Sequence, residues 1–235
     1  MDRKIESYVN IEYDVTKRPL TDYPRKLAIY LANRYDLRGK NLLEAGVGRG
    51  EVLMELATLG VECSCIDRDP IAIEQLLKQC KTRGLKIDCI LADAEMPLHI
   101  RENFYDVIYT KSFLEHLHDP VSFLRNARTK LVPTGIFLNL IPDWESQHTT
   151  YFDDITHKTP FTTETIRQVC LLAGLQDIKV EKFRQLPATW KYPILNSLAA
   201  LISPLVRPRT KSKTLRWSRE LMILSTATSP ETGDV

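Results

Sequence analysis

A glycine-rich turn within residues 41–50 constrains the fold of this sequence more than any other feature. A short apolar run leads into three glycines spaced two apart, Gly46, Gly48 and Gly50, and apolar residues at helical spacing follow from Glu51 to Leu59. This order predicts a strand, a tight turn and the N-terminus of a helix. Glycine lets the backbone adopt positive φ and lets a ligand approach the main chain without an intervening Cβ. The turn is therefore predicted to hold a nucleotide or nucleoside.

The glycine spacing distinguishes between two kinds of cofactor. A dinucleotide fingerprint, G-x-G-x-x-G, places a pyrophosphate at the helix N-terminus, but Glu51 occupies its third glycine position. A carboxylate in that first turn repels a pyrophosphate, whereas a ligand without phosphates tolerates it. The sequence reads Glu44-x-Gly46-x-Gly48-x-Gly50 instead, which resembles the first motif of class I S-adenosylmethionine-dependent methyltransferases. Taken alone, this motif leaves a purely structural glycine turn open as the alternative.

Further motifs follow in the order typical of that family. Asp67 ends the second predicted strand, 21 residues after the first glycine, where a carboxylate accepts the hydroxyls of a ribose. Asp93 and Ala94 follow the third strand, where the family binds adenine. The fourth strand, 105–110, leads to Leu114-Glu115-His116, which the family places beside the transferable methyl group. The resemblance, closest to the type 11 and type 23 methyltransferase families, implies these cofactor contacts: Glu44, Gly46, Gly48, Gly50, Asp67, Arg68, Asp93, Ala94 and Lys111.

Both aspartates also have a second interpretation. An NAD site would use the acidic residue at the position of Asp67 in the same way. A loop aspartate such as Asp93 can simply close an Asx-turn. Capping of the helix predicted from Pro70 is better explained by Asp69 than by Asp67.

The alternation of strands and helices over residues 41–141 predicts an α/β fold with a doubly wound, mostly parallel sheet. The resemblance implies seven strands with the last one antiparallel, and an N-terminal helix, capped by Thr21 or Asp22, that partly covers the cofactor. The predicted segments are a cap-helix region (1–38), a cofactor-binding core (39–185), a basic and apolar insertion (186–218), the last strand (219–227) and a tail (228–235).

Residues 151–162 supply further candidate catalytic groups. They include Asp-x-Thr-His followed by Pro-Phe-Thr and resemble a segment of glycan and cell-envelope methyltransferases. The candidate general bases are His116 first, because imidazole has a suitable pKa, and then His157 and Asp153. Packing of His116 on the cofactor, and a loop held by its own hydrogen bonds, stay open as structural alternatives. Because only three potential ligands gather on this loop, no metal site is predicted.

The net charge of +2 conceals a strong asymmetry. Residues 182–219 contain nine basic and no acidic residues, so subtracting +9 from +2 leaves −7 on the rest of the chain. The apolar run 194–206 lies within this basic stretch. An interfacial helix that contacts anionic membrane through 190–213, a substrate lid and a homodimer contact are all compatible with this pattern. RNA is a weaker candidate because aromatic residues are sparse and no RNA-binding module is visible.

The remaining sequence features predict a cytoplasmic protein, with a peripheral position on the inner face of the membrane as one option. No uninterrupted run of about 18 apolar residues predicts a transmembrane helix. The N-terminus lacks the apolar core of a secretory signal. The five cysteines form no C-x-x-C motif and are predicted to be buried thiols.

Together these features predict transfer of a methyl group from S-adenosylmethionine to a hydroxyl of a sugar, glycolipid or lipid-linked saccharide. The substrate class rests on the resemblance of residues 151–162 and on the basic, apolar insertion. One alternative keeps the reaction but takes an isoprenoid quinone or another small molecule as the acceptor. A second alternative is a protein that binds S-adenosylmethionine without catalysing a reaction.

Overall fold

The structure is a computed structural model that describes residues 21–231. The chain forms two compact units, Met1–Met96 and Pro97–Val235. The seven strands follow the sheet order β3-β2-β1-β4-β5-β7-β6. The predicted α/β fold is confirmed, because β1–β2, β2–β3 and β4–β5 pair in parallel while the last strand, β7, is antiparallel to its neighbours.

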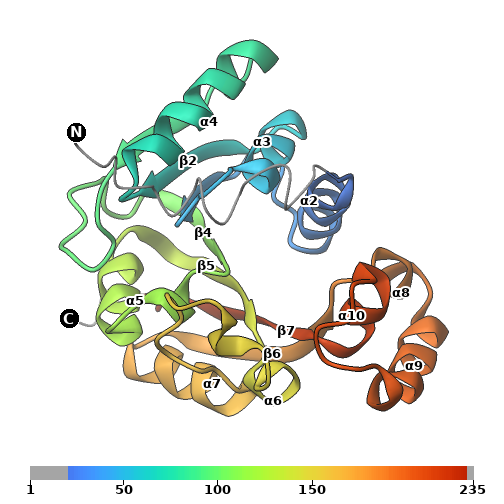
Figure 1. Cartoon of the computed structure of the whole chain (residues 1–235). Coiled ribbons are helices and arrows are strands. Elements are labelled where there is room, and N and C mark those ends of the chain that lie inside the picture. The colour runs from blue at the N-terminus through green and yellow to red at the C-terminus, as the bar shows by residue number, and fades with distance from the viewer. Residues whose placement is uncertain (1–20, 232–235) are drawn as a thin grey trace, which may run out of the picture. The chain divides into compact units, whose positions relative to one another are not determined.

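In its described part, residues 21–96, the first unit has three parallel strands and three helices (Figure 1). Its strands are β1 (Asn41–Ala45), β2 (Glu62–Asp67) and β3 (Asp88–Leu91). Its helices are α2 (Tyr23–Arg34), α3 (Glu51–Thr58) and α4 (Pro70–Arg83). Helix α2 packs against α3. Its buried face includes Leu27 and Leu31. Coverage of the cofactor by α2 stays a prediction.

Local capping explains where these helices begin and end. The Asp69 carboxylate accepts a hydrogen bond from the backbone N–H of Ile71 at 2.9 Å, as predicted, and Gly84 ends α4 in the left-handed conformation. The predicted side-chain cap of α2 is wrong. Asp22 occupies the N-cap position but makes no capping bond, because its carboxylate pairs with Lys26 at 2.6 Å.

The second unit contains four strands. They are β4 (Tyr105–Lys111), β5 (Leu131–Pro142), β6 (Gln176–Arg184) and β7 (Leu221–Thr228). A polar chain runs through their buried centre, from the Thr110 hydroxyl to the Asn139 side-chain oxygen at 2.7 Å and from the Asn139 amide to the Ser225 hydroxyl at 3.2 Å. These bonds join β4, β5 and β7 through side chains as well as backbone.

Helices in the second unit are short. They are η1 (Leu114–His116), α5 (Pro120–Arg128), α6 (Trp144–Gln147), η2 (Tyr151–Asp153), α7 (Thr163–Leu172), α8 (Pro187–Lys191), α9 (Pro193–Ile202), η3 (Ser203–Leu205) and α10 (Lys213–Arg219). Thr162 begins α7 with a capping box in which its hydroxyl accepts from the N–H of Thr165. Within residues 21–231, no helix is both long and apolar enough to cross a bilayer.

The cysteines match the expectation of buried thiols. All five are free, and four of them are buried: Cys63, Cys65, Cys80 and Cys170.

Candidate active site

The glycine-rich turn between β1 and α3 adopts a backbone that favours glycine. Gly46, Gly48 and Gly50 have φ angles of 73°, 51° and 63°, a region that residues with a side chain rarely adopt. At Gly50 an added Cβ would also lie 2.6 Å from the Cδ1 atom of Leu76, which is fully buried. The loop therefore presents bare main chain, as a ligand-binding turn requires.

Asp67, at the end of β2, holds this loop in place. One carboxylate oxygen accepts from the N–H of Gly48 at 3.0 Å and the other accepts from the N–H of Asp69 at 2.9 Å. Each carboxylate oxygen has a further lone pair, so Asp67 can also accept the two hydroxyls of a ribose. The bare loop and this acceptor fit the nucleoside end of S-adenosylmethionine, which carries no phosphate for Glu51 to repel.

The other predicted cofactor contacts lie at four places. Asp93 follows β3, and one of its carboxylate oxygens accepts from the N–H of Glu95 at 3.0 Å. This bond closes the Asx-turn that the sequence offered as the alternative role of Asp93. Its other oxygen can accept from an adenine amino group. Ala94 beside it is buried, Glu44 is buried in β1, and Arg68 is exposed after β2. Lys111 ends β4 in the second unit.

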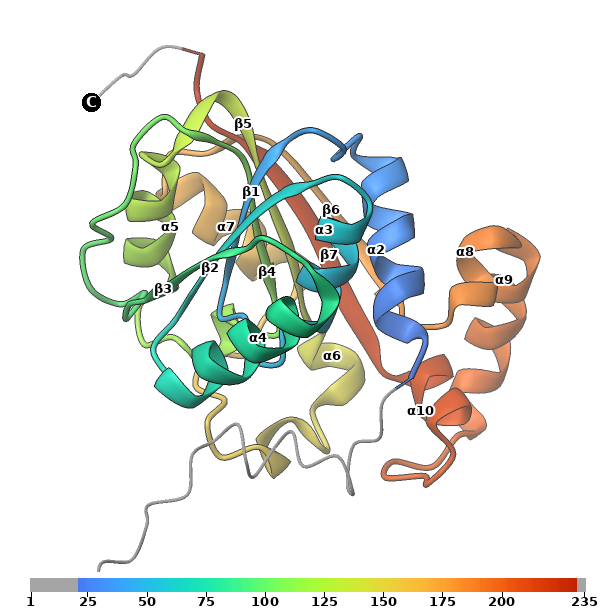
Figure 2. The same ribbon diagram turned by 90° about the horizontal axis from the view of Figure 1, so that it is seen from above.

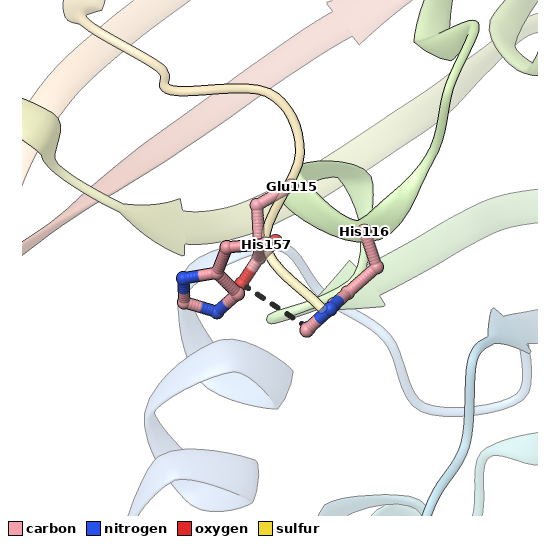
Figure 3. Close-up of side chains that lie close together, drawn as sticks. All are labelled: Glu115, His116 and His157. Atoms are coloured by element: carbon pink, nitrogen blue, oxygen red, sulfur yellow. Dashed lines mark ion pairs between the residues drawn. The ribbon is translucent and has the colours of Figure 1, made fainter. Parts of the chain in front are cut away.

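In the second unit, Glu115, His116 and His157 form a compact cluster. Figure 3 shows their side chains converging, and one ligand-type atom from each lies within 4.8 Å of the others. His116 and Glu115 come from η1, and His157 comes from the loop after η2. Two of the three candidate bases thus lie together. The third does not join them, because Asp153 is exposed and Arg209 donates to both of its oxygens, at 2.7 and 2.9 Å.

Backbone hydrogen bonds lock the loop that carries His157 onto η1. The N–H groups of Lys158 and Thr159 both donate to the carbonyl of Glu115, at 2.7 and 3.1 Å. The Tyr151 hydroxyl donates to the Thr159 carbonyl at 2.6 Å. The loop is therefore held by its own hydrogen bonds, and this fixes the imidazole of His157 relative to that of His116.

The hydrogen bonds of the two imidazoles define their tautomers. The Tyr151 carbonyl, 2.7 Å from Nδ1 of His157, can only accept, so Nδ1 carries the proton. Nδ1 of His116 lies 2.8 Å from the Thr156 hydroxyl, which donates its own proton to Asp154 at 2.6 Å. His116 therefore donates from Nδ1 as well. In both rings the lone pair is on Nε2.

Glu115 was noted in the sequence only as part of a motif, and the structure gives it a larger role. Its side chain is fully buried, and within the described part of the chain neither carboxylate oxygen has a hydrogen-bond partner. Burial raises the pKa of this carboxyl to about 8, and nearby backbone N–H groups and the Lys111 charge offset only part of that effect. Its Oε1 lies 4.0 Å from Nε2 of His116, so a carboxyl that is mostly protonated at neutral pH lies next to an imidazole lone pair.

Two imidazoles and a carboxylate are also ligand types that bind zinc and similar ions. Tetrahedral coordination at ordinary bond lengths requires ligand atoms about 3.4 Å apart. Oε1 of Glu115 and Nε2 of His116 are 4.0 Å apart, which is wider than this, and the three ligand atoms all lie within 4.8 Å of one another.

Comparison with known proteins identifies the domain type. Residues 43–139 match a family described as "Methyltransferase domain". The chain is 28% identical over 114 residues to a ubiquinone biosynthesis O-methyltransferase of Aliivibrio fischeri, covering 48% of each protein. It is 33% identical over 105 residues to the Caulobacter vibrioides protein of the same name, covering 45% of this chain and 42% of that one. The chain thus matches about half the length of these curated relatives.

Solved structures resemble the whole fold at low identity. A putative methyltransferase in complex with the Haloferax volcanii Trm112 activator has a TM-score of 0.71 at 17% identity, with 97% of this chain and 96% of that chain covered. Phosphoethanolamine N-methyltransferase 2 of Haemonchus contortus, in complex with S-adenosyl-L-methionine, has a TM-score of 0.64 at 14% identity, with 88% and 52% covered.

The fold, the glycine-rich loop and the family match define the class of protein. Residues 43–139 form a methyltransferase domain of the class I family. The cofactor of this domain is S-adenosylmethionine.

Proposed function

We propose that the chain transfers a methyl group to a hydroxyl oxygen of a sugar, glycolipid or lipid-linked saccharide. The observation that carries this proposal is the pair of imidazoles whose Nε2 atoms bear lone pairs beside a buried carboxyl group. When bound, the cofactor supplies a methyl group on a sulfonium centre, so its leaving group is already activated. The protein must then orient the acceptor and take its proton.

His116 is the proposed general base. Its Nδ1 proton is directed at the Thr156 hydroxyl, which in turn is bonded to Asp154. This chain of acceptors stabilises the imidazolium that forms when Nε2 takes a proton, as the orienting carboxylate does in a catalytic triad. His157 donates from Nδ1 to a neutral carbonyl, and the Asp154 carboxylate lies 3.9 Å from its Nε2 rather than behind its Nδ1, so His157 is the second candidate. Asp153 is the weakest candidate because Arg209 binds both of its oxygens.

Two classes of methyl acceptor are candidates, and different observations favour each of them. A saccharide hydroxyl is favoured by the resemblance of residues 151–162 and by the basic, apolar insertion that follows. An isoprenoid quinone precursor is favoured by the matched relatives, which are named for ubiquinone biosynthesis. Both acceptors would present a hydroxyl to the same base.

An assay with methyl-labelled S-adenosylmethionine separates these acceptors. Octyl glycosides of several sugars serve as saccharide probes, and a prenylated catechol serves as the quinone-type probe. Label in an alkali-stable ether on a glycoside supports the first candidate, and label on the catechol alone supports the second. Cofactor binding without label in either probe, or in a cell-envelope lipid extract, would favour the non-catalytic alternative.

Replacement of the base tests its assignment. We expect His116→Asn to lower kcat by about 10²–10⁴-fold while binding of S-adenosylmethionine changes little, because only proton removal is lost. The matched control is His118→Asn, an exposed histidine two residues further along. A His116→Asn enzyme with wild-type kcat would contradict the assignment.

Removal of metal ions distinguishes a base from a metal site. We expect enzyme treated with EDTA and desalted to retain full activity, because Oε1 of Glu115 and Nε2 of His116, 4.0 Å apart, are farther from each other than two ligands of a bound zinc ion. Loss of activity that Zn²⁺ or Mn²⁺ restores in the wild type, but not in His157→Asn, would mean that the cluster binds a cation instead.

A further inference from the structure

Three helices between β6 and β7 form an attached group within the second unit. Figures 1 and 2 both show α8, α9 and α10 together beside the ends of these two strands. The buried side chain of Arg184, the last residue of β6, organises the group. Its Nε donates to the Ser218 carbonyl of α10 at 2.9 Å, and its guanidinium also donates to the Asn196 side chain of α9. The Trp190 indole of α8 donates to the Arg184 carbonyl at 2.7 Å.

One face of α9 presents large aliphatic side chains to solvent. Ile194, Leu201 and Leu205 are 71%, 76% and 83% exposed, and Leu198 and Ile202 are about half exposed. Their spacing of four, seven, eight and eleven residues from Ile194 places them on one side of a helix and its continuation into η3. No residue of α9 is buried. An exposed aliphatic face of this size marks an interaction surface.

Positively charged residues flank this face along the chain. Lys191 precedes α9, and Arg207, Lys211 and Lys213 follow it, all of them exposed. Arg209 is engaged with Asp153, so it is not counted among them. The stretch 182–219 contains no acidic residue that could offset these charges. The surface therefore combines an aliphatic face with cationic residues at both ends of it along the chain, called the basic rim below.

We propose that this surface, made of Ile194, Leu198, Leu201, Ile202 and Leu205 with Lys191, Arg207, Lys211 and Lys213, docks on an anionic phospholipid bilayer. The aliphatic face would enter the boundary between headgroups and acyl chains while the basic rim contacts lipid phosphates. With ten residues, α9 can lie in this interface but is too short to span the membrane.

Charge disfavours a second copy of this chain as the occupant. In a twofold dimer the same patch meets itself, so the basic rim of one chain would face the basic rim of the other. Anionic lipid instead supplies charges of the opposite sign. The inference does not depend on the acceptor proposed above, and it holds for a water-soluble acceptor as well.

Flotation of the full-length protein with vesicles tests the proposal. We expect binding to vesicles of phosphatidylcholine with 30% phosphatidylglycerol, weaker binding to phosphatidylcholine alone, and loss of binding as salt is raised. Leu201→Glu/Leu205→Glu should weaken binding to the mixed vesicles by at least tenfold. Arg207→Gln/Lys211→Gln should weaken it by about fivefold per charge removed.

A matched control lies on α7 in the same unit. Leu171 and Leu172 are also exposed, and Leu171→Glu/Leu172→Glu should bind vesicles like the wild type. Circular dichroism melts verify that each variant is folded. Absence of vesicle binding by the wild type, or equal binding by the α9 and α7 variants, would overturn the proposal. A concentration-dependent dimer in light scattering that Leu201→Glu/Leu205→Glu abolishes, without vesicle binding, would also overturn it and identify a second copy as the occupant.

Discussion

At the scale of single residues, glycines and Asp67 shape the cofactor loop, whereas the burial of Glu115 shapes the catalytic cluster. Gly46, Gly48 and Asp67 are recognisable because glycine spacing and a carboxylate at a strand end are local signals. Glu115 is different, since its complete burial arises from elements distant in sequence. The sequence shows that a glutamate precedes His116, but it does not show whether that glutamate faces water. For the same reason, the engagement of Asp153 by Arg209, 56 residues away, could not be predicted.

Replacing Gly50 or Gly84 by alanine distinguishes the cost of backbone strain from the cost of a steric clash. Both have φ near 65°, but a Cβ on Gly84 meets nothing within 4 Å, whereas one on Gly50 meets Leu76 at 2.6 Å. We expect Gly84→Ala to lower the free energy of unfolding by about 1–2 kcal/mol, from backbone strain alone. Gly50→Ala should cost about 1–3 kcal/mol more, because buried Leu76 must shift. Urea denaturation measures both, and equal losses would contradict the close approach at Gly50.

At the scale of elements, local capping and alternation predicted most helices and strands. The cap at Asp69 is predictable because its bond joins neighbours in sequence. Asp22 failed as a side-chain cap because Lys26, one turn later, pairs with the same carboxylate. The polar chain through Asn139 gives no sequence signal, since its partners belong to β4 and β7.

Removal of the Asn139 side chain tests that chain of hydrogen bonds. Asn139→Ala leaves the buried Thr110 and Ser225 hydroxyls without their shared partner, so we expect the free energy of unfolding to fall by about 2–4 kcal/mol. Ser225→Ala removes only one end and should cost about 1 kcal/mol. Chemical denaturation compares the two, and a smaller loss for Asn139→Ala than for Ser225→Ala would contradict this account.

At the scale of the whole molecule, the motif order over residues 41–141 predicts the α/β architecture because each motif follows its own strand. The predicted segments 1–38, 39–185, 186–218, 219–227 and 228–235 stay predictions, and residues 1–20 and 232–235 lie outside the described part of the chain. The basic charge of 182–219 is visible in the sequence. The exposure of the aliphatic face of α9 becomes visible only in the structure, where hydrogen bonds of Arg184 hold α8, α9 and α10. The acceptor is the least predictable part, because one fold serves many substrates.

The most direct test of the central claim is isothermal titration of the full-length protein with S-adenosylmethionine and, separately, with NAD. We predict that S-adenosylmethionine binds and NAD does not, because Glu51 occupies the position where a dinucleotide requires glycine. Asp67→Ala should weaken binding of S-adenosylmethionine by at least about tenfold, since it removes charged hydrogen bonds to the loop and to the ribose. Failure of the wild type to bind S-adenosylmethionine, or a preference for NAD, would contradict the account at its foundation.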